Sequence, residues 1–442
     1  MEQKNIALIA DWNQEGKGVA RVDGKVVFIE GALPGEIVQW QPTRIKKSYA
    51  EGKIKHLLKP STARVSPPCQ YYAHCGGCSC QHIEFSTQVA LKQRAWLNQM
   101  QRLGKVQPAE LIAPIYGWPW HYRERVTLSV GYKHKQLQIG FRSRNSHEIV
   151  DISGCLILPN IVSNALPVIK AYLQRWPEGR LRSIAINQGN EVIALTLHAE
   201  HINSTMRQIA NELIEQLQHQ TKMPWQWWHG DGGQTHLQHD SKSTPTLSYT
   251  LPEYQIHISF TPSDFTQVNR TTNALMVHRA MQWLQPQRGE SIIDWFCGLG
   301  NFSLPIARLG AKVTGVEGMA LMCQQAQENA HANGLADYTK FYQADLFDIS
   351  AKQIQQLGYA HKWLLDPPRA GAQQLISALA QLDIKQLPKR IVYISCDPAT
   401  LARDVHLLVQ RGYHYRAGGI MNLFAQTAHL ESLAIFDWHD HK

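Results

Sequence analysis

The chain has 442 residues, of which 44% are hydrophobic, and this length predicts two or three domains with a core each. No apolar run is long enough to cross a bilayer, and the first residues lack the basic start and apolar stretch of a secretory signal. We therefore expect a cytoplasmic protein with no membrane partner. The net charge of +9 suits a polyanionic partner without requiring one.

The sequence of the first 261 residues predicts two successive domains of different structure. Residues 1–59 alternate short strand-like runs with Gly, Asp-Gly and Pro turns, which is typical of a small β-barrel. Residues 60–261 mix strand-like runs with a clear helix at 204–217, which indicates an α+β domain. A second, amphipathic helix is predicted near 86–104 from the spacing of Val89, Trp96, Met100 and Leu103. Basic residues at the end of the barrel favour RNA among its partners.

From residue 262, strand-like runs alternate with helical stretches, as in a doubly wound parallel sheet. The first run ends in a Gly-x-Gly turn and the second ends at Glu317. Ligands lie beyond the carboxyl ends of such strands, and a carboxylate there suits two ribose hydroxyls. The turn lacks the third glycine of a dinucleotide site, so S-adenosylmethionine fits better than NAD. In the alternative, Asp294 caps a helix and Glu317 is solvated.

Two further acids follow strands of the same sheet. Asp366 precedes two prolines that restrict the backbone, as in methyltransferases that act on planar amines or bases. Asp345 could reach an adenine amino group. The simpler alternatives are that the prolines only stop a helix and that Asp345 is an ordinary surface residue.

Two features of the cysteines suggest function: a cluster of three in the first part of the chain, and a single cysteine at the end of a predicted strand. Eight cysteines in a reducing compartment indicate metal binding or catalysis rather than disulfides. Cys69, Cys75 and Cys78 are spaced C-x5-C-x2-C, and a fourth thiolate would complete a zinc or iron–sulfur site. Cys396 ends an apolar strand before Asp397-Pro398, where it is either a buried packing residue or a nucleophile.

Together these motifs resemble the RNA uracil-5 methyltransferase family. The resemblance is carried, in family order, by DFTQVN, DWFCGLGNF, VEG, DPPRAG, YISCDPAT and FAQTAHLE between residues 264 and 431. With the barrel and the cysteine cluster it covers nearly the whole chain and points to the branch that modifies 23S ribosomal RNA. Two positions depart from the family pattern: Asp397 replaces Asn, and residues 422–425 replace Asp-x-Phe-Pro.

The resemblance implies a multidomain α/β fold. Its parts are an OB-like TRAM barrel at 1–59, an α+β central iron–sulfur domain at 60–261, and a Rossmann-like class I methyltransferase domain at 262–442. It implies S-adenosylmethionine and a [4Fe-4S] cluster as cofactors, with zinc as the alternative metal. The partner it implies is 23S ribosomal RNA, with uridine 1939 as the expected target, and we expect a monomer.

The resemblance also assigns roles to residues. Cys396 would add to carbon 6 of uracil, and Glu431 would remove the carbon 5 proton, with His429 as a helper. The cofactor site would be lined by Gln267, Phe296, Asn301, Glu317, Asp345 and Asp366. The cluster would be bound by Cys69, Cys75, Cys78 and Cys155, the last supplied by the family pattern because Cys80 is too close to Cys78.

Other functions remain open. The chain could methylate tRNA, another ribosomal site or protein, or it could be a non-catalytic RNA-binding module that tolerates loss of Cys396. RNA contacts are expected from the basic stretches 44–59 and 121–135, or from stacking of Tyr71, Tyr72 or the aromatic residues of 225–230. Each basic stretch could equally be a solvated face.

Overall fold

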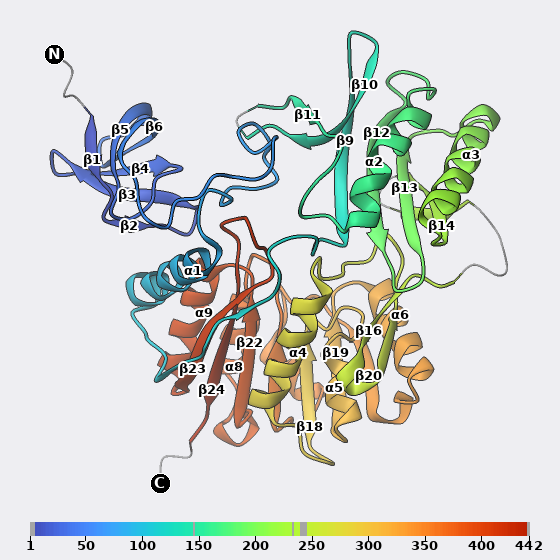
Figure 1. Cartoon of the computed structure of the whole chain (residues 1–442). Helices are drawn as coiled ribbons and strands as arrows, with labels where there is room; N and C mark the ends of the chain where they lie inside the picture. Colours follow the sequence, from blue (N-terminus) through green and yellow to red (C-terminus); the bar gives the residue numbers. More distant parts are fainter. Residues whose placement is uncertain (1–4, 145, 232–233, 239–244, 440–442) are drawn as a thin grey trace.

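The computed structural model describes residues 5–144, 146–231, 234–238 and 245–439. Figure 1 shows a small barrel at the upper left, a central sheet at the upper right, and a large C-terminal sheet below both. In the described ranges, no helix has the length and apolar character needed to span a membrane.

The N-terminal barrel is a single sheet with the order β1-β5-β6-β4-β3-β2. Its strands are β1 (Ile6–Leu8), β2 (Asp11–Trp12), β3 (Lys17–Val22), β4 (Lys25–Glu30), β5 (Ile37–Ile45) and β6 (Tyr49–Lys59). Alternate side chains point inward along each strand, so Val27, Ile29, Val38 and Trp40 fill the core. The predicted strand runs are confirmed.

A buried ion pair joins the barrel to the segment that leaves it. Glu36 is fully buried, and its carboxylate accepts hydrogen bonds from Arg64 at 2.7 and 2.8 Å and from the Leu33 and Ser61 amides at 2.9 and 3.1 Å. These donors lower the pKa of Glu36 against the opposing effect of burial, the largest single influence. The barrel is thereby fixed to residues 61–64.

The central part is an α+β layer. Its sheet has the order β11-β10-β9-β12-β13-β14-β15, and helices α2 and α3 share its core. The strands are β9 (Arg125–Lys133), β10 (Gln136–Arg142), β11 (Ile149–Asp151), β12 (Leu181–Gln188), β13 (Ile193–Ala199), β14 (Trp225–Asp231) and β15 (Gln234–Leu237), and the helices are α2 (Asn160–Leu173) and α3 (Ser204–Thr221). The helix predicted at 204–217 is confirmed as α3.

The expected fold class was wrong in giving this central part an iron–sulfur cluster. Cys69, Cys75, Cys78 and Cys155 line one cavity, but in the described part of the chain no three His, Cys, Asp or Glu side chains are placed to hold a metal ion. The cavity measures about 20 Å³, which is room for about one water molecule. Burial raises the pKa of Cys78 to about 12 and of Cys155 to about 11, so both side chains are neutral thiols in this structure.

The C-terminal sheet has the order β20-β19-β18-β21-β22-β24-β23-β7, and β8 also pairs with β23. Its strands are β7 (Glu110–Leu111), β8 (Ile115–Tyr116), β18 (Ser291–Trp295), β19 (Lys312–Glu317), β20 (Thr339–Gln343), β21 (Lys362–Leu365), β22 (Arg390–Ser395), β23 (His414–Asn422) and β24 (Glu431–Asp437). Strands β18 to β22 pair in parallel, as predicted, whereas β24 is antiparallel to both of its neighbours.

Helices cover both faces of this sheet. On one face lie α4 (Arg270–Leu284), α5 (Ser303–Arg308) and α6 (Ala320–Ala332), together with the hairpin of β16 (Ser248–Leu251) and β17 (Ile256–Ser259). On the other lie α1 (Phe85–Gln99), α7 (Ala351–Gln356), α8 (Gln373–Ala380) and α9 (Pro398–Arg411). Figure 1 shows α1 and α9 side by side at the β23 end of the sheet.

Helix α1 only partly follows its predicted pattern. The spacing of Val89, Trp96, Met100 and Leu103 predicted one buried face, and the first three are buried in the core that α1 shares with the C-terminal sheet. Leu103 is exposed because the helix widens into a π-helical turn at Met100–Gly104, which rotates the later residues off that face.

We expect Arg64→Met to destabilise the barrel by about 3 kcal/mol, because it leaves the Glu36 carboxylate buried without its cationic partner. Hydrogen exchange of the β4 and β5 amides measures the free energy of barrel opening. Arg21→Met is the matched control, since Arg21 is exposed and its guanidinium donates a long hydrogen bond of 3.4 Å to the Gly24 carbonyl. Equal protection in both variants would contradict the assigned role.

Candidate active site

One edge of the C-terminal sheet collects most of the predicted site residues. The parallel strands β18, β19, β20, β21 and β22 all end at this edge. Strand β18 lies between β19 and β21, and the helices that follow β18 and β21, α5 and α8, cover opposite faces of the sheet. This is the topological switch point at which such sheets bind their ligands. Because β24 runs antiparallel to β22, its first residue, Glu431, lies at the same edge.

The register of β22 and β24 brings Cys396 and Glu431 together. Ser395 pairs with Ser432 in the antiparallel ladder, so the residues that follow and precede them, Cys396 and Glu431, face each other just beyond it. Opposite residues of an antiparallel pair point to the same face, with Cβ atoms about 5 Å apart. The Ser432 hydroxyl also donates to the Ser395 carbonyl at 3.1 Å, which fixes this register.

The surroundings of Cys396 favour its neutral thiol. Burial raises the pKa of Cys396 to about 12, and the negative charges of Glu431 and Asp366 add to this. The Arg369 guanidinium acts in the opposite direction. A thiolate at this position therefore depends on positive charge near the strand end.

Glu431 is a buried carboxyl group at the start of a strand. It is 4% exposed, and burial, reinforced by Asp366 and opposed by Arg369, raises its pKa well above the ordinary value. Within the described residues, its buried Oε2 atom has no hydrogen-bond partner. A buried, unpaired carboxylate oxygen beside a thiol is an arrangement suited to proton transfer.

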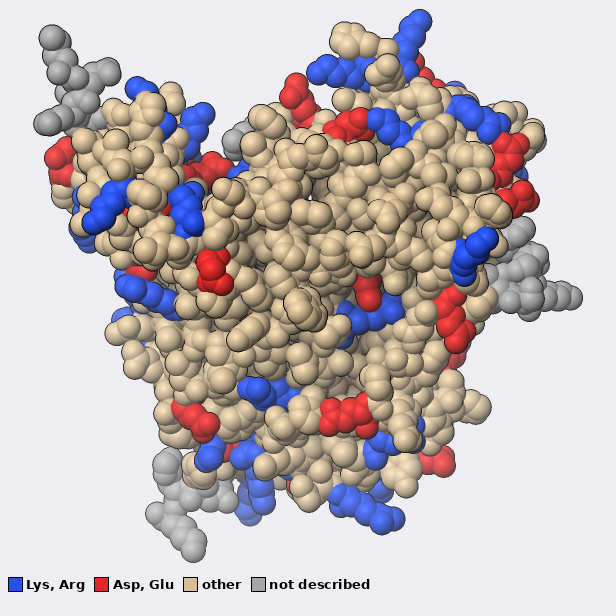
Figure 2. Space-filling model, in the orientation of Figure 1, with Lys and Arg blue, Asp and Glu red and all other residues tan. Residues whose placement is uncertain are grey.

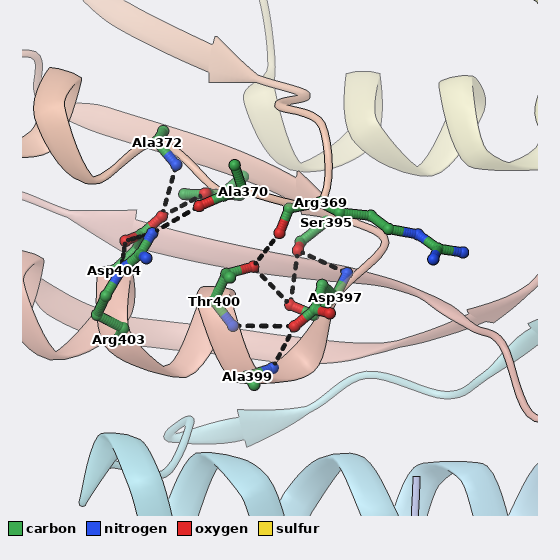
Figure 3. A network of polar contacts seen from close by, with 10 residues as sticks. Arg369, Ala370, Ala372, Ser395, Asp397, Ala399, Thr400, Arg403 and Asp404 are labelled. Atoms are coloured by element: carbon green, nitrogen blue, oxygen red, sulfur yellow. Dashed lines mark hydrogen bonds and ion pairs between the residues drawn. The ribbon is translucent and has the colours of Figure 1, made fainter. Parts of the chain in front are cut away.

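Polar contacts hold the strand end that carries Cys396 (Figure 3). The Asp397 side chain caps α9 by accepting from the Ala399 and Thr400 amides at 2.8 and 3.0 Å, and the Thr400 hydroxyl donates to the Arg369 carbonyl at 3.1 Å. Asp and Asn cap helices about equally well, which explains why Asp397 can replace the family's Asn. In Figure 3 the Arg369 side chain extends away from this network.

The buried Asp404 carboxylate joins β22 to the turn that follows β21. It accepts from the Tyr393 hydroxyl on β22 and from the Ala372 amide, each at 2.7 Å. Because Ala372 follows the DPPRAG segment, this contact links the turn that carries Asp366 and Arg369 to the strand that delivers Cys396.

The glycine turn after β18 has a strained backbone. Phe296, Gly298 and Gly300 all have positive φ, of 62°, 52° and 93°. A bulky residue such as Phe rarely adopts this conformation, and such outliers concentrate at functional sites. The Glu317 carboxylate accepts from the Gly298 amide at 3.2 Å and from the Gly318 and Met319 amides at 2.8 and 3.2 Å, so it is held against this turn.

The other predicted cofactor residues differ in their burial and in whether their side chains are free to bind a ligand. Asp345 is exposed after β20 and accepts from the Phe347 amide at 2.9 Å, and Asp366 is partly buried with a pKa raised by burial to about 7. Asn301 lies after the glycine turn, but its amide is used in hydrogen bonds of 3.0 Å with Tyr249 and Asn273. Asn301 therefore supports the turn, and its side chain is committed to neighbours.

Gln267 is positioned by the central part of the chain. It lies partly buried in the segment 264–269 before α4. The Glu124 amide donates to the Val268 carbonyl at 2.8 Å, and the Glu124 carboxylate pairs with Arg270 at 2.5 Å. The start of β9 thus holds this segment against the C-terminal sheet.

Three residues near the site were missed as functional residues by sequence reasoning. Arg369 was quoted only as part of a motif, although a cation directly after Asp366-Pro-Pro was a usable signal. Asp294, considered above only as a helix cap, is fully buried and accepts from the Ser303 hydroxyl. Lys92 is fully buried on α1, far away in sequence.

The predicted stacking residues are largely unavailable. Trp225 and Trp227 are each 1% exposed in the central core, so the prediction that they stack on RNA is wrong. Tyr72 is covered by the Arg144 guanidinium, 4.3 Å from its ring centre. A groove between the barrel and β10 carries Lys17, Arg142 and Arg144 beside Glu15 and Glu30, and Figure 2 shows basic side chains on the barrel and a notch between it and the central part.

Comparison with known proteins identifies the relationship. Residues 115–437 match the tRNA (Uracil-5-)-methyltransferase family, and residues 7–55 match the TRAM domain. The chain belongs to this uracil-5 methyltransferase family. It is 43% identical to the 23S rRNA (uracil(1939)-C(5))-methyltransferase RlmD of Neisseria lactamica, over 98% of this chain and 95% of that one. It is 42% identical to the RlmD of Nitrosospira multiformis, over 97% and 98%.

A solved structure shares the family fold. The tRNA (uracil-54, C5)-methyltransferase of Pyrococcus abyssi, in complex with S-adenosyl-L-homocysteine, superimposes with a TM-score of 0.73 at 21% identity. The match covers 98% of this chain and 100% of that chain. The likeness therefore extends through the barrel, the central part and the C-terminal sheet.

We expect Asp294→Asn to stabilise the protein above neutral pH. Burial raises the pKa of Asp294 to about 7, so from about pH 4 to 7 the folded state keeps a proton that the unfolded state loses. The free energy of unfolding therefore falls as the pH rises through this window, by up to about 4 kcal/mol for this group.

Thermal unfolding from pH 4 to 8 measures the effect. Asn keeps the acceptor for Ser303 and removes the titration, so the melting temperature of the variant should fall less with pH than that of the wild type. Asp337→Asn, at an exposed position, is the control and should follow the wild type. If the Asp294→Asn variant melts at a lower temperature than the wild type at every pH, ionisation of the buried Asp294 does not destabilise the protein and the prediction is wrong.

Proposed function

We propose that this protein methylates carbon 5 of a uridine in 23S ribosomal RNA, with Cys396 as nucleophile and Glu431 as general base. The observation that carries the residue roles is the pairing of β22 with β24, which sets a thiol opposite a buried carboxyl group at the ligand edge of the sheet. The substrate follows from the RlmD relatives, which match over nearly the whole chain at about 40% identity. Their named target, uridine 1939, is also the one implied by the sequence resemblance.

The first chemical task belongs to Cys396. Carbon 5 of uracil is a weak nucleophile, and addition of a thiolate at carbon 6 makes it enolate-like, so that it can accept a methyl group. Because the resting thiol has a pKa of about 12, Arg369 is the protein cation placed to favour its ionised form. The strand end holds the sulfur in place through the contacts of Asp397 and Thr400.

The second task belongs to Glu431. After methylation, carbon 5 carries both the methyl group and a proton, and the proton must leave before the carbon–sulfur bond can break. Burial raises the pKa of Glu431, which strengthens its carboxylate as a base. Its Oε2 atom, which makes no hydrogen bond within the described residues, is the atom we assign to this step.

S-adenosylmethionine, when bound, supplies a methyl group on a positively charged sulfur. The residues that fit it are those around the strained turn: Phe296 and the glycines, which bring backbone close, and Glu317, whose oxygens keep lone pairs for ribose hydroxyls. Gln267, Asp345 and Asp366 complete the proposed set, and Asn301 contributes by supporting the turn.

We propose that the TRAM barrel and the groove beside it bind parts of the RNA that lie outside the active site. Lys17, Arg142 and Arg144 supply positive charge there, and phosphate contacts of this kind position RNA without reading its sequence. A target base within folded RNA would have to be flipped into the site, at a cost of a few kcal/mol. With ribosomal RNA as substrate, the protein would work in the cytoplasm, and we propose that it does so as a monomer.

The two proposed catalytic residues should give opposite chemical signatures. Cys396→Ala should abolish methylation and form no covalent complex with RNA. Glu431→Gln should lower turnover by about 10²- to 10⁴-fold and accumulate a methylated protein–RNA adduct, because the base is lost after the nucleophile has acted. Denaturing gels and mass spectrometry with unmodified 23S RNA fragments and S-adenosylmethionine measure both.

Glu328→Gln is the control, since Glu328 is exposed on α6 and should keep wild-type turnover. Active Cys396→Ala would overturn the nucleophile assignment. Wild-type protein that methylates tRNA but no 23S fragment would overturn the proposed substrate.

A further inference from the structure

The loop between β23 and β24 carries Glu431 into the site and is held by a buried lysine. Residues 423–430 connect the two strands. The Lys92 side chain comes from α1, more than 300 residues earlier, and is fully buried. Its ammonium group donates to Asn422 Oδ1 at 2.6 Å, to the Phe424 carbonyl at 3.0 Å and to the His429 carbonyl at 2.7 Å.

These contacts use every proton of the ammonium group and span the loop from end to end. An ammonium group has three donors and no acceptor, and each donor here has one oxygen. One acceptor precedes the loop and another lies two residues before Glu431. Lys92 therefore ties the two ends of the loop together, next to the Met421–Glu431 pair at which the β23–β24 ladder ends.

Neighbouring residues hold the middle of the same loop. Gln88, one helical turn before Lys92, donates to Gln426 Oε1 at 3.0 Å and accepts from the Gln426 amide at 3.2 Å. The Gln426 carbonyl accepts from the Ser79 and Cys80 amides, both at 2.9 Å. The loop thus rests on α1 and the segment before it, although both lie outside the C-terminal half of the chain.

One of the three acceptors, Asn422, is a departure from the family pattern. Where the family usually has Asp, this chain has Asn422, so the ammonium group meets only uncharged oxygens. Burial consequently lowers the pKa of Lys92 to about 8, with the Cys80 thiol as the opposing influence. Burying a charge is unfavourable unless the group is fully hydrogen-bonded. The geometry indicates that this buried charge serves to hold the loop in one conformation.

We propose that Lys92 is a positioning residue that orients Glu431 for removal of the carbon 5 proton by fixing the loop between β23 and β24. This inference rests on the proposed role of Glu431. It predicts a defect after methyl transfer, when the base acts, and no defect in binding S-adenosylmethionine, because the residues proposed to bind that cofactor lie on β18 to β21 and the segment before α4.

Lys92→Met keeps a long unbranched side chain and removes all three donors. We expect it to slow adduct resolution by about 10- to 100-fold, the scale of a displacement of about 1 Å at a reacting group. In single-turnover reactions the methylated covalent complex should accumulate, as in Glu431→Gln, while the KM for S-adenosylmethionine stays within about twofold of wild type. Arg94→Met is the matched control: it lies on the same helix, pairs with Asp11 of the barrel, and should resolve the adduct at the wild-type rate.

A double variant separates positioning from stability. Lys92→Met with Asn422→Leu replaces a polar pair by apolar groups and should recover much of any lost melting temperature. Resolution should stay slow, because the carbonyls of Phe424 and His429 still lack their donor. If resolution recovers together with stability, Lys92 is only structural and the inference is overturned.

The wild type and Glu431→Gln distinguish the two levels of failure. If Glu431→Gln traps an adduct but Lys92→Met resolves it at the wild-type rate, the Lys92 inference alone is wrong. If the wild type forms no adduct, or Glu431→Gln resolves it normally, the proposed function fails and the inference fails with it.

Discussion

The arrangement of the site depends on one strand that runs against the others. In a fully parallel sheet, carboxyl ends meet at one edge, and only residues that follow a strand can reach the ligand. Because β24 is antiparallel to β22, a residue that begins a strand, Glu431, reaches the same edge and faces Cys396. The pairing of Ser395 with Ser432 therefore decides whether the proposed nucleophile and the proposed base lie side by side at this edge.

This pairing is supported from distant parts of the chain. Asp404 and Thr400 hold the β22 side through short-range contacts within the C-terminal half. The β24 side relies on Lys92 and Gln88 of α1, which belong to the segment between the barrel and the central sheet. Trp12 and Leu33 of the barrel segment share a small apolar cluster with Cys80 and with Ala428 of the loop. The barrel, the cysteine segment and the large sheet therefore meet at the loop that carries Glu431.

The sequence predicted the helices and strands better than it predicted how the strands pair with one another. Period-two and β-branched runs located the parallel strands, and strand-end acids located the ligand edge. The facing of Cys396 and Glu431 could not be derived, because strand direction and register are set by pairing across the sheet, which local pattern does not encode. Trp225 and Trp227 were misassigned because an aromatic run fits both a stacking surface and a core strand.

The cysteine cluster and Lys92 show two further limits. Spacing grouped Cys69, Cys75 and Cys78, and the family resemblance added Cys155; all four line one cavity, but whether a cavity can hold a metal depends on its size and on how the surrounding side chains pack. Lys92 had one usable signal: it lies three residues after Val89 and four before Trp96, on the buried face of its helix. A lysine there requires buried acceptors, which only the folded chain reveals.

The most direct test of the central claim is a disulfide between positions 396 and 431. Opposite residues of an antiparallel pair have Cα atoms about 5 Å apart, within the range that a disulfide spans. In Glu431→Cys, mild oxidation should link the new thiol to Cys396, and mass spectrometry should find the joined peptides, which disappear when Cys396 is also replaced by Ala. Failure of these two thiols to join in the folded protein, while the Glu431→Cys thiol reacts freely with an alkylating reagent, would contradict the register on which the site depends.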